Sequence, residues 1–170
     1  MNISRFRLAL LPLFAQISRL TVSASMQSEM QKHDYYTVKP GKLGVEVFGI
    51  NLNNPNVPVP QNVIDQIKKD VHKYRIMIFR DQGKVSGKRH VEISKWFGDL
   101  ESTFYRHPRS PDLDVFRVSN DESEGCTGVG RTGWHVDGSF QPAPFAYALY
   151  HMYHVPKKGD TGTFSECPSP

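Results

Sequence analysis

A histidine and a carboxylate two residues apart, His135 and Asp137, are the side chains of this sequence best suited to chemistry. On an extended segment side chains alternate, so both would point to the same side. One nitrogen and one oxygen ligand on one short element make two-thirds of the 2-His-1-carboxylate triad that holds non-haem Fe(II). A solvated surface strand carries the same pair. A bare His-x-Asp does not decide between these two interpretations.

Several motifs around this pair occur in a fixed order. They are Phe79-Arg80-Asp81-Gln82 after an apolar run, Trp96-Phe97-Gly98-Asp99-Leu100, His107-Pro108, Gly133-Trp134-His135-Val136-Asp137-Gly138-Ser139-Phe140 and Val155-Pro156-Lys157-Lys158-Gly159-Asp160-Thr161. From about Val38 to Thr161 they resemble the taurine dioxygenase (TauD/TfdA) family of Fe(II)/2-oxoglutarate-dependent dioxygenases. Five ordered matches are far more specific than any one of them.

The resemblance implies a set of roles. His135 and Asp137 would bind Fe(II). The cosubstrates would be 2-oxoglutarate and O2. The enzyme would hydroxylate a small organic substrate, which an anionic compound could be. Thr161 resembles the threonine that binds a 2-oxoglutarate carboxylate, with a plain turn residue as the alternative. His107 resembles a histidine that meets an anionic head group, with a solvated loop histidine as the alternative. Arg131 stands where the family has an asparagine, which argues against taurine itself.

The resemblance stops after Thr161, and residues 162–170 are rich in Ser and Pro. We expect a divergent, disordered tail and a truncated copy that lacks the family's distal histidine and its 2-oxoglutarate arginine. His151 and His154 would face opposite sides of a strand, so at most one could replace the missing ligand. The alternatives are a catalytically inactive isoform that acts only as a binding protein, or a protein that binds another divalent ion.

Apolar periodicity and turn residues predict the elements that position these motifs. We expect helices over Asn62–Tyr74 and from a cap at Ser86 to about Phe97, and strands at Val45–Phe48, Ile76–Phe79, Asp114–Val118 and Ala146–Val155. The run Ile76–Phe79 suggests a strand buried on both faces. The fold class is α+β. The resemblance implies that residues 31–161 form the N-terminal part of a double-stranded β-helix, or jelly roll, with flanking helices, and that this fold is incomplete.

The composition of residues 1–28, with three arginines, several serines and no acidic residue, predicts a targeting leader. A mitochondrial transit peptide is the first interpretation. A secretory signal is a second, and a cytoplasmic protein that starts at Met26 or Met30 is a third. The apolar run Leu8–Ala15 is too short to cross a membrane, so we expect no transmembrane span.

Composition excludes several classes of protein. A hydrophobic content of 38% and a charged content of 22% are typical of a globular chain. Outside the leader, acidic and basic side chains nearly balance, and no basic patch interleaved with aromatics predicts a nucleic-acid partner. Two cysteines, Cys126 and Cys167, support no disulfide framework. The sequence does not predict an oligomeric state.

Overall fold

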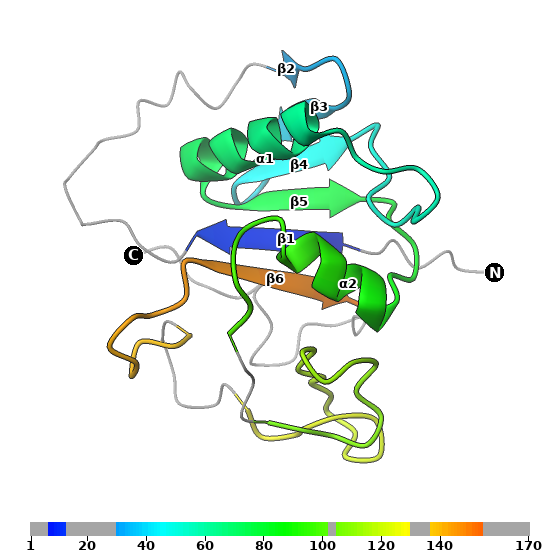
Figure 1. Ribbon diagram of the computed structural model, residues 1–170, viewed down its shortest axis with the longest axis vertical. Helices are drawn as coiled ribbons and strands as arrows, with labels where there is room; N and C mark the ends of the chain where they lie inside the picture. The colour runs from blue at the N-terminus through cyan, green and yellow to red at the C-terminus, as the bar shows by residue number, and fades with distance from the viewer. Residues whose placement is uncertain (1–6, 13–29, 102–104, 130–136, 155–170) are drawn as a thin grey trace.

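The computed structural model describes residues 7–12, 30–101, 105–129 and 137–154 of the chain. Its elements, in chain order, are β1 (Arg7–Pro12), β2 (Gln31–Lys32), β3 (Thr37–Pro40), β4 (Val45–Phe48), α1 (Gln61–Tyr74), β5 (Met77–Arg80), α2 (Gly87–Ser94) and β6 (Tyr147–Met152). The strands form one six-stranded sheet in the order β2-β3-β4-β5-β1-β6 (Figure 1).

Strands β4 and β5 are parallel, with Val45 opposite Met77, whereas the other described strand pairs are antiparallel. A parallel pair needs a crossover, and α1 provides it. Gly44 lets the two strands start side by side. Its φ is +60°, and a Cβ atom there would lie 2.3 Å from the carbonyl oxygen of Ile76, so only glycine fits.

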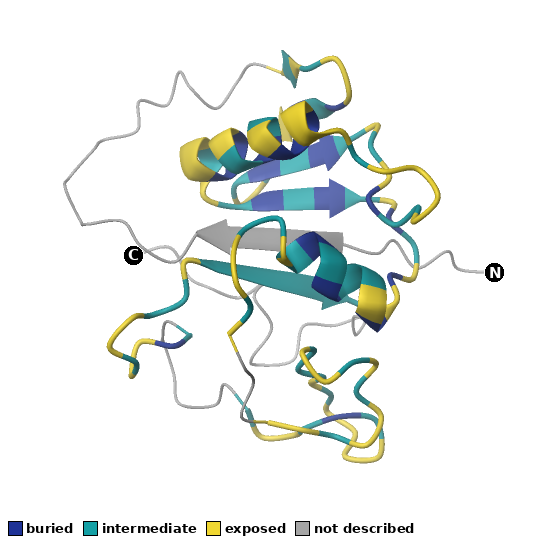
Figure 2. Cartoon of the chain, in the orientation of Figure 1, coloured by how far each residue is buried: buried dark blue, intermediate teal, exposed yellow. Residues whose placement is uncertain are grey.

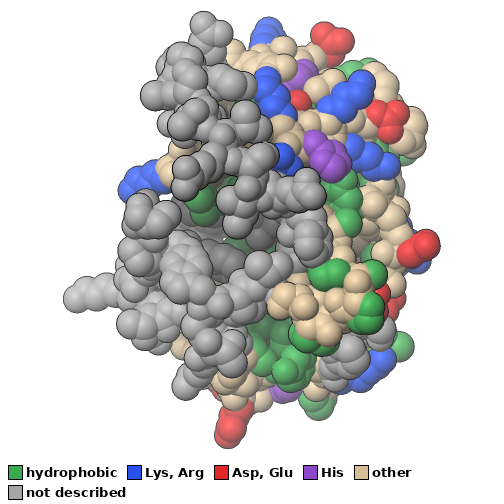
Figure 3. Space-filling model, turned by 90° about the vertical axis from the view of Figure 1, so that its left-hand side faces the viewer, with side chains coloured by type: hydrophobic (Ala, Val, Ile, Leu, Met, Phe, Trp, Pro, Cys, Tyr) green, Lys and Arg blue, Asp and Glu red, His purple; other side chains and the backbone are tan. Residues whose placement is uncertain are grey.

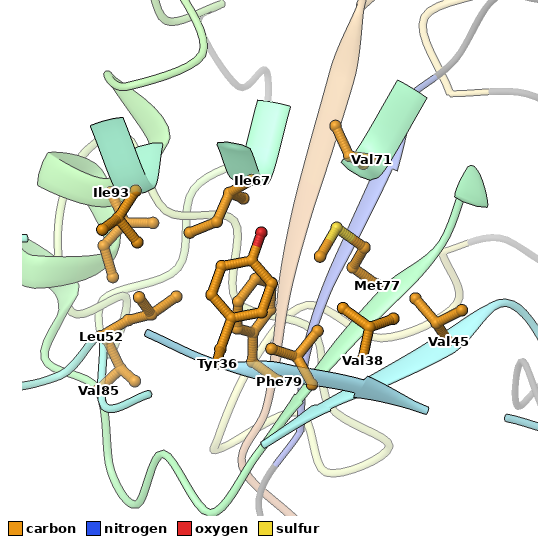
Figure 4. Packing of buried hydrophobic residues seen from close by; sticks show 12 residues of the cluster. Tyr36, Val38, Val45, Leu52, Ile67, Val71, Met77, Phe79, Val85 and Ile93 are labelled. Carbon is orange, nitrogen blue, oxygen red and sulfur yellow. The ribbon is translucent and has the colours of Figure 1, made fainter. Parts of the chain in front are cut away.

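Both helices pack against the same face of the sheet. Buried side chains of α1 and Ile93 of α2 belong to one apolar cluster with alternate residues of β3, β4 and β5. In Figure 4, Ile67 and Val71 of α1 lie on one side of the cluster and Phe79 and Met77 of β5 on the other. Figure 2 shows buried and exposed residues alternating along α1, as expected for a helix with one face on a core.

The prediction that the β5 strand is buried on both faces was wrong. Met77 and Phe79 are buried on the helix side, whereas Ile78 and Arg80 are only partly buried. On that other face Arg80 forms an ion pair with Glu46 of β4. The unbroken apolar run therefore reflects burial of one face, and Arg80, the last residue of the strand, forms an ion pair on the other.

The predicted helices are confirmed, with one shorter than expected. Helix α1 begins directly after Pro60. At the start of α2 the hydroxyl oxygen of Ser86 accepts a hydrogen bond from the backbone N–H of Arg89, as the cap prediction requires. The regular helix ends at Ser94, and a single turn closed by Phe97 N–H on the Ser94 carbonyl follows it.

The strand predicted at Asp114–Val118 does not form. The backbone N–H of Asp114 donates to the side chain of Asp112 instead, and that of Val115 donates to the Asp112 carbonyl. Such local bonds from an aspartate compete with a strand ladder. What remains of the prediction is one isolated bridge between Val118 and Cys126.

Strand β1 comes from the segment that the sequence analysis assigned to a leader. Its backbone pairs with β5 on one side and with β6 on the other, Leu10 opposite Met77 and Leu149 respectively. The sequence analysis did not anticipate this strand or the short β2 and β3. The leader remains a prediction. Removal of residues 1–28 would take β1 out of the sheet and leave β5 and β6 without this pairing partner.

One sheet with two helices agrees with the predicted α+β class and is compatible with an incomplete jelly roll, which remains a prediction. Among the described residues, neither helix has the length and apolar character needed to cross a membrane. On the face drawn in Figure 3, basic and acidic side chains are interspersed over the described surface.

Candidate metal centre

Asp137 lies at the start of a tight turn that precedes β6. The next residue, Gly138, is buried and has a φ of +72°. The N–H of Gln141 closes the turn by donating to the Gly138 carbonyl at 2.9 Å. A Cβ atom on Gly138 would lie 3.0 Å from the ring of Phe145, so the ring packs directly on the turn. The backbone next to the predicted carboxylate ligand is therefore tightly fixed.

The side chain of Asp137 is held as well. The hydroxyl of Tyr150, in the middle of β6, donates a hydrogen bond to Oδ2 of Asp137 at 2.6 Å. Burial raises the pKa of the Tyr150 hydroxyl, and the hydrogen bond to Asp137 and its charge raise it further. The hydroxyl therefore stays protonated and acts as a donor to the carboxylate.

The opposite face of β6 packs toward the helices. Tyr147 and Leu149 pack against the apolar cluster, and Nε2 of His151 lies 3.2 Å from the carbonyl oxygen of Gly83. Burial lowers the pKa of His151, and it lowers that of His90 on α2, which the nearby His151 lowers further. His151 and Tyr150 thus lie on opposite faces, which disfavours His151 as the replacement ligand beside Asp137. His154 is exposed beyond the strand end.

His107 lies in a different place. Its Nδ1 accepts a hydrogen bond from the N–H of Arg109 at 3.2 Å, and its Nε2 lies 3.0 Å from the carbonyl oxygen of Glu122. Both ring nitrogens therefore tie two parts of the 105–129 loop together. His107 also lines a pocket of about 330 Å³ together with Tyr105 and Arg106. Asp137 is not among the residues that line this pocket.

The same loop is braced by charge. Oε1 of Glu124 lies 2.6 Å from a guanidinium nitrogen of Arg109, and its Oε2 accepts a hydrogen bond from Arg117 at 2.6 Å. Arg117 also donates to the Glu124 backbone carbonyl. One carboxylate thus joins two arginines, and this arrangement holds the pocket wall near His107.

The remaining predicted site residues, His135 and Thr161, lie outside the described residues, as does Arg131. Within residues 7–12, 30–101, 105–129 and 137–154, no three His, Cys, Asp or Glu side chains come together in a way that could hold a metal ion. The structure therefore describes one of the two predicted ligands, Asp137, and its surroundings.

A sequence model of the "Taurine catabolism dioxygenase TauD, TfdA family" matches residues 34–167. The chain belongs to this family. The matched range spans most of the chain and includes every predicted site residue. No solved structure matches the chain. The resemblance found in the sequence motifs is thereby confirmed.

The TauD/TfdA-like motif at the end of β5 has a structural role, which its last residue, Gln82, carries through hydrogen bonds. Gln82 is buried, and its side-chain oxygen accepts the N–H of Leu52 at 2.7 Å. Its amide nitrogen donates to the carbonyl oxygens of Ile50 and Arg80 at 2.8 and 2.6 Å. Gln82 thus fastens the loop before α1 to the end of β5. It supports the fold and does not face Asp137.

Sequence reasoning did not single out Tyr150 or Gln82. The motif Phe79-Arg80-Asp81-Gln82 was noticed as a resemblance, without a role for the glutamine. For Tyr150, the available signal was strand alternation, which separates it from the residues of β6 that face the core. Strand alternation predicts which face of β6 carries Tyr150 but does not predict its hydrogen-bond partner. The contact with Asp137 is therefore seen only in the structure.

Proposed function

We propose that this TauD/TfdA protein is an Fe(II)- and 2-oxoglutarate-dependent dioxygenase that hydroxylates a small organic substrate. One observation carries the proposal: the family match over residues 34–167 covers the segments that contain His135, Asp137 and Thr161. The family's description as a dioxygenase supports an oxidoreductase.

The chemistry of the donor set fits a ferrous ion. The carboxylate of Asp137 is partly buried and fixed by a hydroxyl donor, and His135, two residues earlier, offers an imidazole nitrogen. Ferrous iron accepts both ligand types. When bound, iron with 2-oxoglutarate and O2 supplies the oxidising power. The chain's own part is to hold these groups, to orient the substrate and to limit access of water.

We assign the cosubstrate and substrate contacts to two further residues. Thr161 would donate its hydroxyl to a carboxylate of 2-oxoglutarate. His107 would meet an anionic group of the substrate, and this assignment is supported by Arg106 in the lining of the same pocket. Asp112 also lines the pocket, so the positive charge there is partly offset. Because both nitrogens of His107 bind backbone groups, contact with substrate requires one of these bonds to open.

Succinate formation tests the proposal. The 170-residue chain, which offers two of the three expected metal ligands, should form little succinate from 2-oxoglutarate with Fe(II) and O2. A chain extended with the family's distal histidine and 2-oxoglutarate arginine should form it, and the His135→Ala and Asp137→Ala variants of the extended chain should not. A panel of small organic acids, with sulfonates among them, should stimulate the reaction unequally if one of them resembles the substrate. Iron binding without succinate formation by the extended chain would instead favour a protein that only binds its ligands.

We propose, separately, that residues 1–28 direct the chain to mitochondria. A fluorescent protein fused after residue 28 should accumulate in mitochondria. Secretion of the fusion would favour the signal-peptide interpretation, and diffuse cytoplasmic fluorescence would favour a start at Met26 or Met30.

A further inference from the structure

The partner of Asp137 within the described structure is a tyrosine thirteen residues later in the chain. Tyr150 and Asp137 are joined by a hydrogen bond of 2.6 Å between the hydroxyl and Oδ2. Both side chains are partly buried. A charge-assisted bond of this length is among the stronger hydrogen bonds in proteins, so it restricts the rotation of the carboxylate.

The strand fixes Tyr150 in turn. Its neighbours Leu149 and His151 are turned to the helix side, where Leu149 packs against the core and His151 lies near the Gly83 carbonyl. Because side chains alternate along a strand, these contacts direct Tyr150 to the opposite face. The hydroxyl is therefore presented from a rigid element.

The backbone of Asp137 is fixed from the other side. The turn at Gly138 and the ring of Phe145 hold the main chain, as described above. Within the described residues, different parts of the chain thus constrain Asp137 at its backbone and at Oδ2. A ligand held in this way has little conformational freedom left to lose on binding a metal.

From this geometry we infer that Tyr150 is a positioning residue for the metal ligand Asp137: its hydroxyl orients the carboxylate and engages Oδ2, so that the metal is bound through one oxygen. The inference rests on the proposed function, because it takes Asp137 to be a ligand. Partners of this kind around metal ligands typically contribute about tenfold to a hundredfold in metal affinity. Tyr150 touches no reacting atom, and its effect is carried by Asp137.

The test uses Co(II) as a probe that needs no turnover. Its affinity for the full chain is measured by titration, and its visible absorption spectrum reports the ligand geometry. Tyr150→Phe keeps the ring and removes the hydroxyl. We expect Co(II) affinity to fall about tenfold or more and the spectrum to change. Unchanged affinity with an unchanged spectrum would overturn the inference.

Tyr147→Phe is the matched control. Tyr147 lies on the same strand but on the other face, and its hydroxyl lies 2.6 Å from Nε2 of His72. The control also loses one hydrogen bond made by a tyrosine hydroxyl of β6, so it should affect the stability of the fold about as much as Tyr150→Phe. It should not change the affinity for Co(II). If both variants weaken Co(II) binding equally, the role of Tyr150 is merely structural and the inference is wrong.

A double-variant cycle separates this inference from the proposed function. In an Asp137→Asn background, Tyr150→Phe should cause no further loss of Co(II) affinity, because its effect passes through the carboxylate. If Asp137→Asn weakens binding and Tyr150→Phe does not, the metal site stands and the inference fails. If Asp137→Asn leaves binding unchanged, Asp137 is not a ligand and both fail. Should Tyr150→Phe unfold, Tyr150→Gln, which keeps an N–H donor, must retain more Co(II) affinity than Tyr150→Leu for the inference to hold.

Discussion

The hydroxyl of Tyr36 donates a hydrogen bond to Oδ2 of Asp70 at 2.6 Å, although both residues are almost completely buried. The bond joins the start of β3 to the middle of α1. The side-chain amide of Gln66 donates to the other oxygen, and Nε2 of His33 lies 2.9 Å from Oδ2. Burial raises the pKa of Tyr36, and the bond to Asp70 raises it further. A buried carboxylate is stable only with such partners.

Removal of the Tyr36 hydroxyl should destabilise the fold. Tyr36→Phe removes the hydroxyl donor to Oδ2 of a buried carboxylate and leaves that oxygen with His33 alone, and we expect the free energy of unfolding to fall by about 1.5–3 kcal/mol. Chemical denaturation of the full chain measures it. Tyr35→Phe is the control, because Tyr35 is 48% exposed and its change should stay within about 0.5 kcal/mol. Equal effects of the two substitutions would contradict the importance of the Asp70 network.

The turn after Asp137 can be tested with two glycines that have the same φ. Gly138 and Gly128 both have a φ of +72°, but a Cβ atom meets the Phe145 ring at 3.0 Å on the first and nothing within 4 Å on the second. Each alanine substitution should cost about 1–2 kcal/mol for the left-handed conformation. Gly138→Ala should cost more, since the ring must move.

The same pair of variants reports on the metal centre. Gly138→Ala should weaken Co(II) binding because it shifts the backbone of Asp137, whereas Gly128→Ala should not. Thermal unfolding and Co(II) titration measure the two effects separately. If the two variants lose equal stability and bind Co(II) alike, the contact with Phe145 does not hold the site.

The histidines between α2 and β6 predict a dependence of stability on pH. Burial lowers the pKa of both His90 and His151 from 6.5. Above that value both are neutral in the folded and the unfolded chain, so they add no pH dependence. As the pH falls below 6.5, the unfolded chain takes up protons first, and stability declines until the pH passes the lowered folded-state pKa values.

Unfolding temperatures between about pH 5 and 8 check this sign. The His90→Gln/His151→Gln variant should lose part of the decline on the acidic side, because glutamine does not titrate. His154→Gln, at an exposed position after β6, serves as the control and should keep the decline. A wild-type chain that becomes more stable as the pH falls through this range would contradict the assignment.

Deletion of residues 1–28 should promote association. The deletion removes β1, which pairs with β5 and β6, and so leaves a strand edge bare on each of them. Bare edges are templates for pairing with other chains. Light scattering after size-exclusion chromatography should detect oligomers or aggregates. Ala9→Pro, which keeps the segment but removes one backbone donor, should act in the same direction more weakly. A monomeric deletion variant with a cooperative unfolding transition would show that β1 is dispensable.

Apolar spacing and capping residues predicted the helices and strands that depend on neighbouring residues in the sequence. The apolar spacing in Asn62–Tyr74, the cap at Ser86 and the apolar run before Arg80 gave elements close to those observed. The pattern around Asp114 failed because the side chain and the carbonyl of Asp112 accept the backbone N–H groups of Asp114 and Val115. Strand β1 was missed because an acid-free, arginine-containing start is equally typical of a leader.

The candidate site divides in the same way. His135 and Asp137 lie two residues apart in the sequence, so their spacing could be interpreted at once. The bond from Tyr150 to Asp137 depends on how a turn and a strand thirteen residues apart are placed. The position of His107, in a pocket that Asp137 does not line, likewise depends on the path of the 105–129 loop. No spacing rule contains such tertiary contacts.

Anaerobic titration of the full chain with Fe(II), in the presence of 2-oxoglutarate, tests the central claim most directly. We expect one loosely bound ferrous ion per chain, because two protein ligands leave most of its coordination to water and 2-oxoglutarate, and a visible charge-transfer band only when both components are present. His135→Ala and Asp137→Ala should each weaken binding by more than about a hundredfold, beyond the loss of an outer partner such as Tyr150, while His154→Ala should not. Fe(II) binding that survives both substitutions, or a band that forms without either side chain, would contradict the assignment of His135 and Asp137 as the ligands.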